Sequence, residues 1–491
     1  MVELEGVEHL RLRRRGSTGL ELKVRYLLQA EAPREVPRED YSLNIEFIVP
    51  YSLNVTPANY GTEAFYDSRK LYVRFDTPRI ELDRLLDPHN DESPLTRSET
   101  TANAILDGAD PARTDFVYES KMLGAVYKSL LRDSFRNLDP YNDAQVAALV
   151  ASASLVPARF HRIVRGLSGK VSEQVATHAS LIDEHLSLLL EHYLLEIAWR
   201  PSLPEVAETI RSELDYRTEQ GYPTGRVRNA DEPELEEYVF REKQLKNYVS
   251  EVLFFRVRES DQRIRIQHMT YAAAAGLAMA VATAIAFFGQ SVFGRLTLSL
   301  FILLVVSYML KDRMKDVTRD LFMRSIGRRF YDRRESLYDP VFRKQLATVR
   351  ERAGFAKRPR RGKKYEQPKP RAVGSWDRRT RFVYTKRVTL HASTLRRIHR
   401  RVRGVADTSI FDLAPMLHAA ARLYGNVPVE QPDGTIAAQR VRRIYHIDMI
   451  ITYTDADGPQ VRNVVLTVAH GRIQRVTFDG QQVTSTMPVT G

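Results

Sequence analysis

Three histidines come closest, by type and spacing, to a metal-binding or catalytic cluster in this chain. His178, His185 and His192 recur every seven residues in a segment of helical periodicity, so they share one helix face. Seven helical residues rise about 10.5 Å, which is too far for two of these imidazoles to bind one metal ion. Only His192 and Glu196 have the i,i+4 spacing that shared ligands need. We therefore expect these histidines to pack or hydrogen-bond between helices, with a pH-responsive interface as the alternative, and we expect no metal or other cofactor.

A second pair of titratable residues lies near the C-terminus. His446 and Asp448 are two residues apart in the alternating stretch RRIYHIDMIITYT, so both point to one face of a predicted strand, where acid–base chemistry is geometrically conceivable. Polar side chains also occur on the solvent face of any half-buried strand. We favour this non-catalytic interpretation of the pair. The candidate catalytic residues are thus His446, Asp448, His192 and Glu196.

Other catalytic signatures are missing. The chain contains no cysteine, which removes thiolate metal sites and cysteine nucleophiles. The segment RGLSGKV has Gly and Lys without the spacing or the hydroxyl residue of a phosphate loop, and no nucleophile elbow, zinc-protease helix or kinase motif set is present. These residues resemble no known family. The sequence therefore argues against an enzyme without excluding one.

Two apolar segments dominate the middle of the chain. Residues 269–288 are twenty residues without a charge, which as a helix are about 30 Å long, the thickness of a bilayer core. Residues 292–310 are nearly as long and contain only Arg295 as a charge. Basic clusters flank the two outer ends, which by the positive-inside tendency predicts a two-helix transmembrane hairpin with both termini in the cytoplasm. We expect the cell inner membrane as the location; a buried helical hairpin in a soluble domain is the alternative.

Small residues repeat along the first apolar segment. Ala272, Gly276, Ala280 and Ala284 fall on one helical line, with a neighbouring line of alanines at 274, 278, 282 and 286. In lipid, such lines let helix backbones approach closely. We expect the first line to pack against the second apolar helix or, next, against a second copy of the chain.

The net charge of +13 is concentrated in one segment, because residues 311–381 contain 24 Lys or Arg and 9 Asp or Glu. Basic surfaces beside a membrane favour anionic headgroups. The residues expected to contact that surface are Arg263, Arg265, Lys311, Arg313, Lys315, Lys357, Arg358, Arg360, Arg361, Lys363 and Lys364. Nucleic acid is the weaker alternative, since no RNA-binding aromatic motif accompanies the charge.

Periodicity and composition divide the chain into seven parts. These are a β-rich domain (1–86), a polar linker (87–114), a helical domain with a neck helix (115–268), the transmembrane hairpin (269–288 and 292–310), a basic amphipathic juxtamembrane helix (311–356), a basic Pro-rich linker (357–380) and an α+β domain (381–491). The predicted fold class is a multidomain membrane protein, with N-terminal β and then α-helical cytoplasmic regions, a two-helix transmembrane hairpin, and a C-terminal α+β cytoplasmic domain.

These observations favour a membrane-anchored cytoplasmic scaffold or regulatory protein without catalytic activity. The expected partners are a bilayer with anionic headgroups and a second copy of the chain or another protein. A membrane-tethered enzyme with an unfamiliar site in the helical or C-terminal domain is the first alternative. Nucleic-acid binding through the basic linker is the second.

Overall fold

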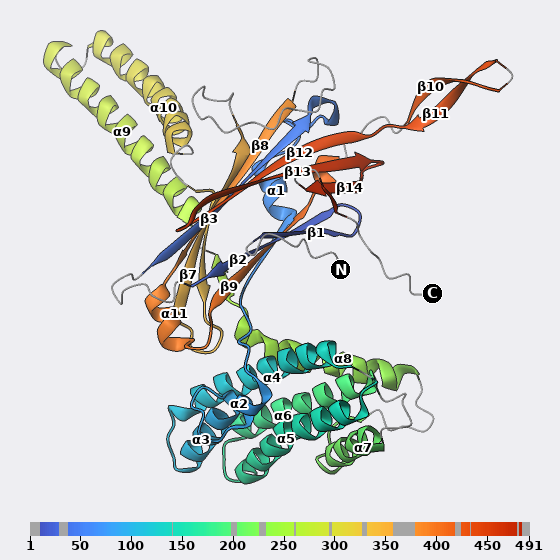
Figure 1. The fold of residues 1–491 in the computed structure, drawn as a ribbon. Helices are drawn as coiled ribbons and strands as arrows, with labels where there is room; N and C mark the ends of the chain where they lie inside the picture. Colours follow the sequence, from blue (N-terminus) through green and yellow to red (C-terminus); the bar gives the residue numbers. More distant parts are fainter. Residues whose placement is uncertain are drawn as a thin grey trace.

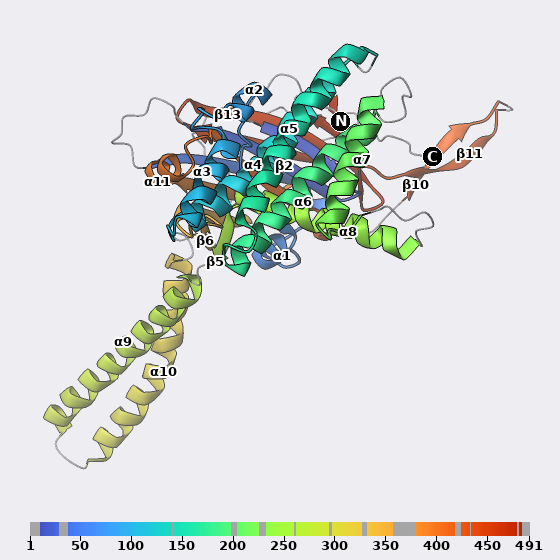
Figure 2. The ribbon, with the colours of Figure 1, turned by 90° about the horizontal axis from the view of Figure 1, so that it is seen from below.

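The protein consists of a β sandwich, a bundle of helices beside it, and a pair of long helices that projects from the sandwich (Figures 1 and 2). The structure is a computed structural model. It describes residues 10–28, 38–139, 141–197, 204–224, 232–259, 262–293, 297–326, 331–356, 379–417, 424–432, 434–478 and 481–483.

The larger sheet of the sandwich has nine antiparallel strands in the order β15-β14-β13-β12-β3-β8-β7-β6-β5. Their bounds are β3 Glu39–Pro50, β5 Arg256–Glu259, β6 Arg333–Tyr338, β7 Gln345–Phe355, β8 Arg379–Leu390, β12 Tyr445–Asp455, β13 Gly458–Ala469, β14 Arg472–Phe478 and β15 Gln481–Val483. Side chains alternate between the two faces of each strand, and β3 buries every second residue in that way. One face of this sheet is therefore apolar and forms the core.

The smaller sheet packs on that apolar face. Its strand order is β1-β2-β9-β4, with bounds β1 Leu10–Arg15, β2 Gly19–Leu27, β9 Gly404–Asp412 and β4 Arg69–Phe75. Phe65, from the short helix α1 (Thr62–Asp67), contacts the rings of Phe382 and Tyr384 on β8 and of Phe411 on β9. A separate two-stranded sheet, β10 (Tyr424–Glu430) and β11 (Ile436–Arg442), extends away from the sandwich (Figure 1). The short helices α11 (Ala392–Ile398) and α12 (Ala414–Leu417) flank β9.

The helical bundle follows β4 in the sequence. Its helices are α2 Leu82–Leu86, α3 Pro94–Leu106, α4 Ala112–Asn137, α5 Asp143–Leu167, α6 Glu173–Leu195, α7 Pro204–Glu219 and α8 Glu232–Ser250. The Ser93 hydroxyl accepts a hydrogen bond from the Thr96 amide and caps α3, with Pro94 at the first helical position. The predicted polar linker 87–114 thus contains an ordered helix, because its Ser, Thr and Pro residues cap and start that helix.

The sandwich combines segments that the sequence assigned to separate domains. β3 lies between β8 and β12, and β2 pairs with β9, so the segments 1–86 and 381–491 form one β domain. The segment 311–356 contains the strands β6 and β7 after its helix, and the predicted neck helix ends at Ser250, before β5. Alternating polarity predicts strands, but it does not say which distant strands pair.

The predicted two-helix transmembrane hairpin and its inner-membrane location are wrong. Among the described residues, only one helix, His268–Phe293 within α9 (Gln262–Phe293), is long and apolar enough to cross a membrane. α10 (Leu298–Ile326) is apolar only from 298 to 310, about 20 Å of helix, and is charged beyond that point. The fold is a mixed α/β multidomain fold. Since the transmembrane hairpin is wrong, the predicted topology of two spans with both termini in the cytoplasm is wrong as well.

Candidate functional site

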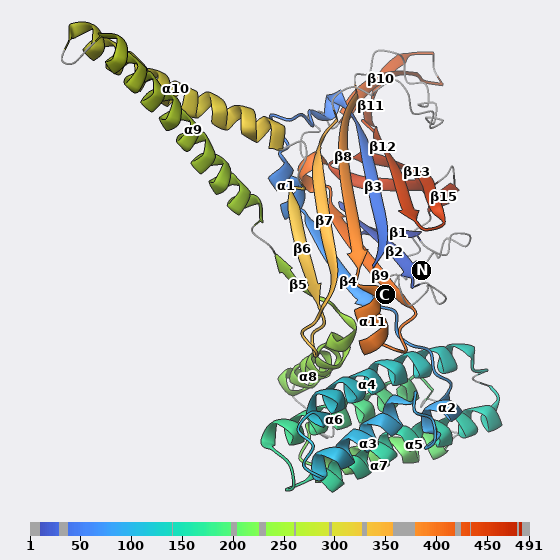
Figure 3. The same ribbon diagram turned by 90° about the vertical axis from the view of Figure 1, so that its left-hand side faces the viewer.

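The helices α9 and α10 lie side by side and run in opposite directions (Figures 1 and 3). Close approach requires Gly289, because a Cβ atom there would lie 2.3 Å from Cδ2 of Leu303. The Ser307 hydroxyl donates a hydrogen bond of 3.2 Å to the carbonyl of Ala282, and Ala274 and Ala278 are buried farther along α9. Small residues of α9 therefore allow α10 to approach closely.

Large apolar side chains at the far end of this pair face outward. We call residues 281–293 of α9 and 298–310 of α10 the apolar tip. Phe287, Phe288 and Leu298 have relative solvent exposures of 70%, 71% and 75%. Other exposed members are Val292, Phe293, Phe301, Ile302, Leu304, Val305, Val306, Tyr308, Met309 and Leu310. Monomeric soluble proteins rarely expose so large a continuous apolar surface, so the tip is a candidate interaction surface.

The charged part of α10 lies beside the other half of α9. The guanidinium of Arg319 is 5.5 Å from the ring centre of Tyr271, and the Lys311 ammonium is 4.0 Å from that of Tyr308. Arg313 and Lys315 are exposed, whereas Lys311 is half-buried. The side chains of Arg263 and Arg265, and the residues Lys357, Arg358, Arg360, Arg361, Lys363 and Lys364, lie outside the described residues.

The line of small residues favoured from the sequence does not face α10. Ala272, Gly276, Ala280 and Ala284 are all exposed, and a Cβ atom on Gly276 would meet nothing within 4 Å. The contact with α10 is made by the neighbouring line that begins at Ala274.

His446 and Asp448 lie on one face of β12, as predicted, but each has a separate partner. Nδ1 of His446 is 3.3 Å from the Thr467 hydroxyl, and Asp448 forms an ion pair with Arg379. Thr467 is on β13 and Arg379 is on β8, on opposite sides of β12 in the sheet, so the two contacts do not converge on a common point. The pair is the polar face of a half-buried strand.

The three histidines of α6 have different surroundings. His192 and Glu196 are exposed at the end of the helix. His185 is buried beside Gly124 of α4, and burial lowers its pKa to about 3. His178 is also buried, and burial followed by the charge of Lys121 lowers its pKa to about 3, so both imidazoles are neutral at neutral pH.

His178 contacts a serine in an arrangement that resembles a nucleophile and its base. The Ser120 hydroxyl is 2.7 Å from Nε2 of His178 and donates to the Phe116 carbonyl at 2.6 Å. The imidazole therefore donates from Nε2 to Ser120 and accepts at Nδ1 from the Tyr248 hydroxyl, 2.7 Å away. Ser120 has no exposed surface, so the hydrogen bonds join α4, α6 and α8 and offer no substrate access.

A second polar cluster, which the sequence did not indicate, joins α5, α6 and α7. Nδ1 of His161 is 2.6 Å from Oδ1 of the fully buried Asp183, and its Nε2 is 3.5 Å from Glu213. The hydroxyl of Tyr216 donates to Asp183 at 2.7 Å, and the His161 and Tyr216 rings stack with centres 3.7 Å apart. Burial lowers the pKa of His161, but Asp183 and Glu213 outweigh burial and raise it to about 9. No short motif links these residues, so spacing alone could not reveal the cluster.

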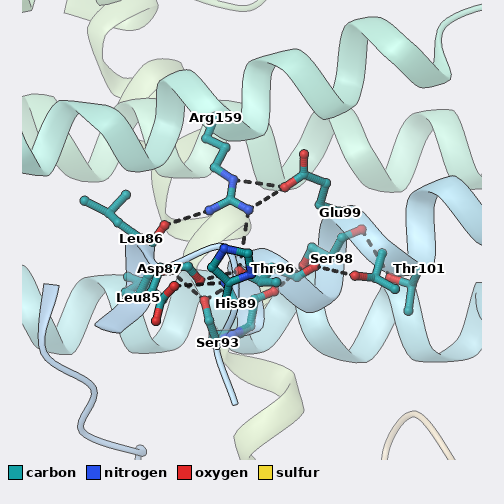
Figure 4. Close-up of polar contacts among 12 residues, drawn as sticks. Leu85, Leu86, Asp87, His89, Ser93, Thr96, Ser98, Glu99, Thr101 and Arg159 are labelled. Carbon is teal, nitrogen blue, oxygen red and sulfur yellow. Dashed lines mark hydrogen bonds and ion pairs between the residues drawn. The ribbon is translucent and has the colours of Figure 1, made fainter. Parts of the chain in front are cut away.

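Arg159 on α5 forms hydrogen bonds with residues at the start of the bundle (Figure 4). Its Nε donates to Glu99 at 3.0 Å, and its Nη1 donates to the Leu86 carbonyl at 2.9 Å. The Ser93 hydroxyl also donates to the Leu85 carbonyl at 2.6 Å. These bonds hold the α2–α3 connection in place, which is a structural role.

The polar clusters are thus sealed, and no group of three or more His, Asp or Glu residues within the described ranges could hold a metal ion. Comparisons of the chain with protein-family models, curated proteins and solved structures find no match. The candidate functional surface is therefore the exposed apolar tip.

Proposed function

We propose that this protein is a non-catalytic scaffold or regulatory protein that attaches to a lipid bilayer through the apolar tip of α9 and α10. The observation that carries the proposal is the exposure of the tip. Only 17% of the most apolar part of α9 is buried within the protein, whereas the core helix of a soluble protein is mostly buried. Transfer of an apolar surface of this size from water to a non-aqueous environment is strongly favourable in free energy.

Lipid fits the tip better than a single protein partner does. The exposed residues include Phe287 and Phe288 on α9 and Phe301, Ile302 and Met309 on α10, so apolar side chains are present on both helices and in successive turns. A docking protein covers one face of a helix pair, whereas acyl chains surround it. At the end of the tip, Lys311 lies over the ring of Tyr308, and tyrosines and basic residues are common where a helix leaves the hydrocarbon layer.

The sandwich and the bundle suit an interaction role. Their buried titratable residues lie between packed elements, where His178, for example, hydrogen-bonds with Ser120 and Tyr248. A catalytic site needs convergent polar groups at a surface that a substrate can reach. The arrangement therefore favours a rigid platform held near a membrane over a membrane-tethered enzyme.

Vesicle flotation tests this function with the full-length protein. We expect the wild type to float with phosphatidylcholine vesicles. The variant Phe287→Ser/Phe288→Ser loses two exposed rings, each worth about 2 kcal/mol on burial, so it should remain mostly at the bottom of the gradient.

The matched control is Val427→Ser/Val429→Ser on β10, which removes two exposed apolar side chains far from the tip. This variant should float as the wild type does. Absence of flotation, together with a stable oligomer that the phenylalanine variant dissociates, would show that a second copy covers the tip and would contradict the proposal.

A further inference from the structure

The open face of the nine-stranded sheet carries a row of three arginines. Arg334 on β6 is directly opposite Arg350 on β7, and Arg350 is directly opposite Arg387 on β8. The neighbouring residues Glu351 and Lys386 are fully buried in the sandwich, so alternation places Arg350 and Arg387 on the outer face. Adjacent strands are about 4.8 Å apart, so the row spans about 10 Å. We call these three residues the arginine row.

No described helix or strand covers this face (Figure 3). Arg387 is exposed and Arg350 is half-buried. Arg352 on β7 lies on the same face, two residues from Arg350. The face is therefore basic and accessible. Pairing of the strands fixes the backbone spacing between these arginines.

Within the described residues, no carboxylate forms an ion pair with Arg350 or Arg387. Elsewhere on the same face, arginines are neutralised, since Arg379 pairs with Asp448 and Arg381 with Glu46. Like charges directly opposite one another destabilise a sheet. Arg350 and Arg387 therefore repel one another across the two strands, and an anion that binds between them relieves this repulsion.

We propose that the arginine row binds an acidic, extended segment of a partner protein. Every basic side chain in the row is arginine, whose planar fork matches carboxylates in a bidentate manner. Alternate side chains of an extended peptide are about 6.8 Å apart, which is also the spacing of Arg350 and Arg352 along β7. A segment with an acid at every second position therefore presents its carboxylates in register with the strand.

Two other anions fit the face less well. Headgroups extend only about 5–8 Å beyond the hydrocarbon layer, whereas α10 continues for about 24 Å after the apolar tip before β6 begins. This step rests on the lipid attachment proposed above. Sheets that bind single-stranded nucleic acid provide aromatic platforms, and Tyr338 is the one aromatic side chain that the described parts of β6, β7 and β8 place on this face.

Fluorescence anisotropy tests the proposal with the full-length protein in neutral detergent, so it does not depend on membrane attachment. The probe is a labelled eight-residue peptide of alternating Glu and Ser. We expect binding that weakens as salt increases and that falls about tenfold or more in Arg350→Glu/Arg387→Glu. Arg350→Lys should also weaken binding, because lysine lacks the fork.

The matched control is Arg11→Glu/Arg13→Glu, which makes the same charge change on the exposed face of β1 in the other sheet. Peptide binding should be unchanged in this variant, and unfolding curves should show that both double variants are folded. The proposal fails if the peptide does not bind at low salt, or if both double variants lose binding equally. It also fails if an oligonucleotide of equal charge, or vesicles of anionic lipid, bind the arginine row more tightly than the peptide does.

Discussion

Arg69 of β4 and Glu351 of β7 form an ion pair of 2.7 Å between the two sheets, and their side chains are only 3% and 0% exposed. Glu335 on β6 lies 3.5 Å from the same guanidinium, and the Tyr384 hydroxyl donates to Glu351 at 2.6 Å. Burial of such charges is tolerated only when each has partners of opposite charge or hydrogen bonds. This cluster therefore determines the relative position of the two sheets and also stabilises their packing.

Replacement of Arg69 by methionine should lower the free energy of unfolding by about 3–5 kcal/mol. The substitution leaves Glu335 and Glu351 buried without their cation, which is far more costly than the loss of a surface pair. Urea unfolding followed by tyrosine fluorescence measures the change. The control is Arg25→Met, whose pair with Asp76 is about half exposed on the arginine side and should contribute less than about 1 kcal/mol. Equal losses in the two variants would contradict the account of the cluster.

His161 should make stability depend on pH above neutrality. Its pKa is about 9 in the folded protein, above the value of about 6.5 expected when unfolded, so its charged form is stabilised by folding. That stabilisation is complete below pH 6.5 and is lost as the pH rises toward 9. The difference in unfolding free energy between the wild type and His161→Gln should therefore shrink by about 3 kcal/mol over this range.

The comparison of two proteins at each pH removes the contributions of other groups. Lys128, whose pKa burial lowers to about 8, titrates in both proteins and cancels in the difference. A difference that stays constant from pH 6 to pH 9 would show that His161 is neutral between its carboxylates.

Gly124 should tolerate no side chain. A Cβ atom there would lie 2.5 Å from Cγ1 of Val249 on α8 and 3.3 Å from Cδ2 of His185. Gly124→Ala should lower the melting temperature, because a clash of about 1–3 kcal/mol exceeds the gain of about 1 kcal/mol in helix propensity. Gly166→Ala in α5, where nothing lies within 4 Å, should raise the melting temperature. The same direction of change in both variants would contradict the packing described for α4 and α8.

Individual helices and strands of this fold could be predicted from the sequence, but the pairing of the strands and the packing of the helices could not. Alternation predicted β3 and β12, and helical periodicity predicted α4 and α6. The pairing of β3 with both β8 and β12 joins residues more than 300 positions apart, and no local pattern encodes such a choice. The same limit applies to His161 and Asp183, which only the packing of α5 on α6 brings together.

The membrane topology was predicted wrongly for a physical reason. The apolar segments 269–288 and 292–310 are nearly equal in length in the sequence, but in the structure the charged part of α10, which includes Arg319, lies beside Tyr271 of α9. The apolar lengths of the two helices therefore do not match. His446 and Asp448 illustrate the opposite case, since their shared strand face was predicted but their separate partners, Thr467 and Arg379, were not.

The most direct test of lipid attachment uses the absence of cysteine from the chain. A single cysteine at Phe288→Cys, labelled with an environment-sensitive dye, reports on the tip, and Arg13→Cys on β1 reports on the sandwich. With vesicles, the dye at 288 should shift its emission to shorter wavelengths and be quenched by lipids brominated on their acyl chains, while the dye at 13 should change in neither respect. Unchanged emission at 288 in the presence of vesicles, or equal quenching at both positions, would contradict the account.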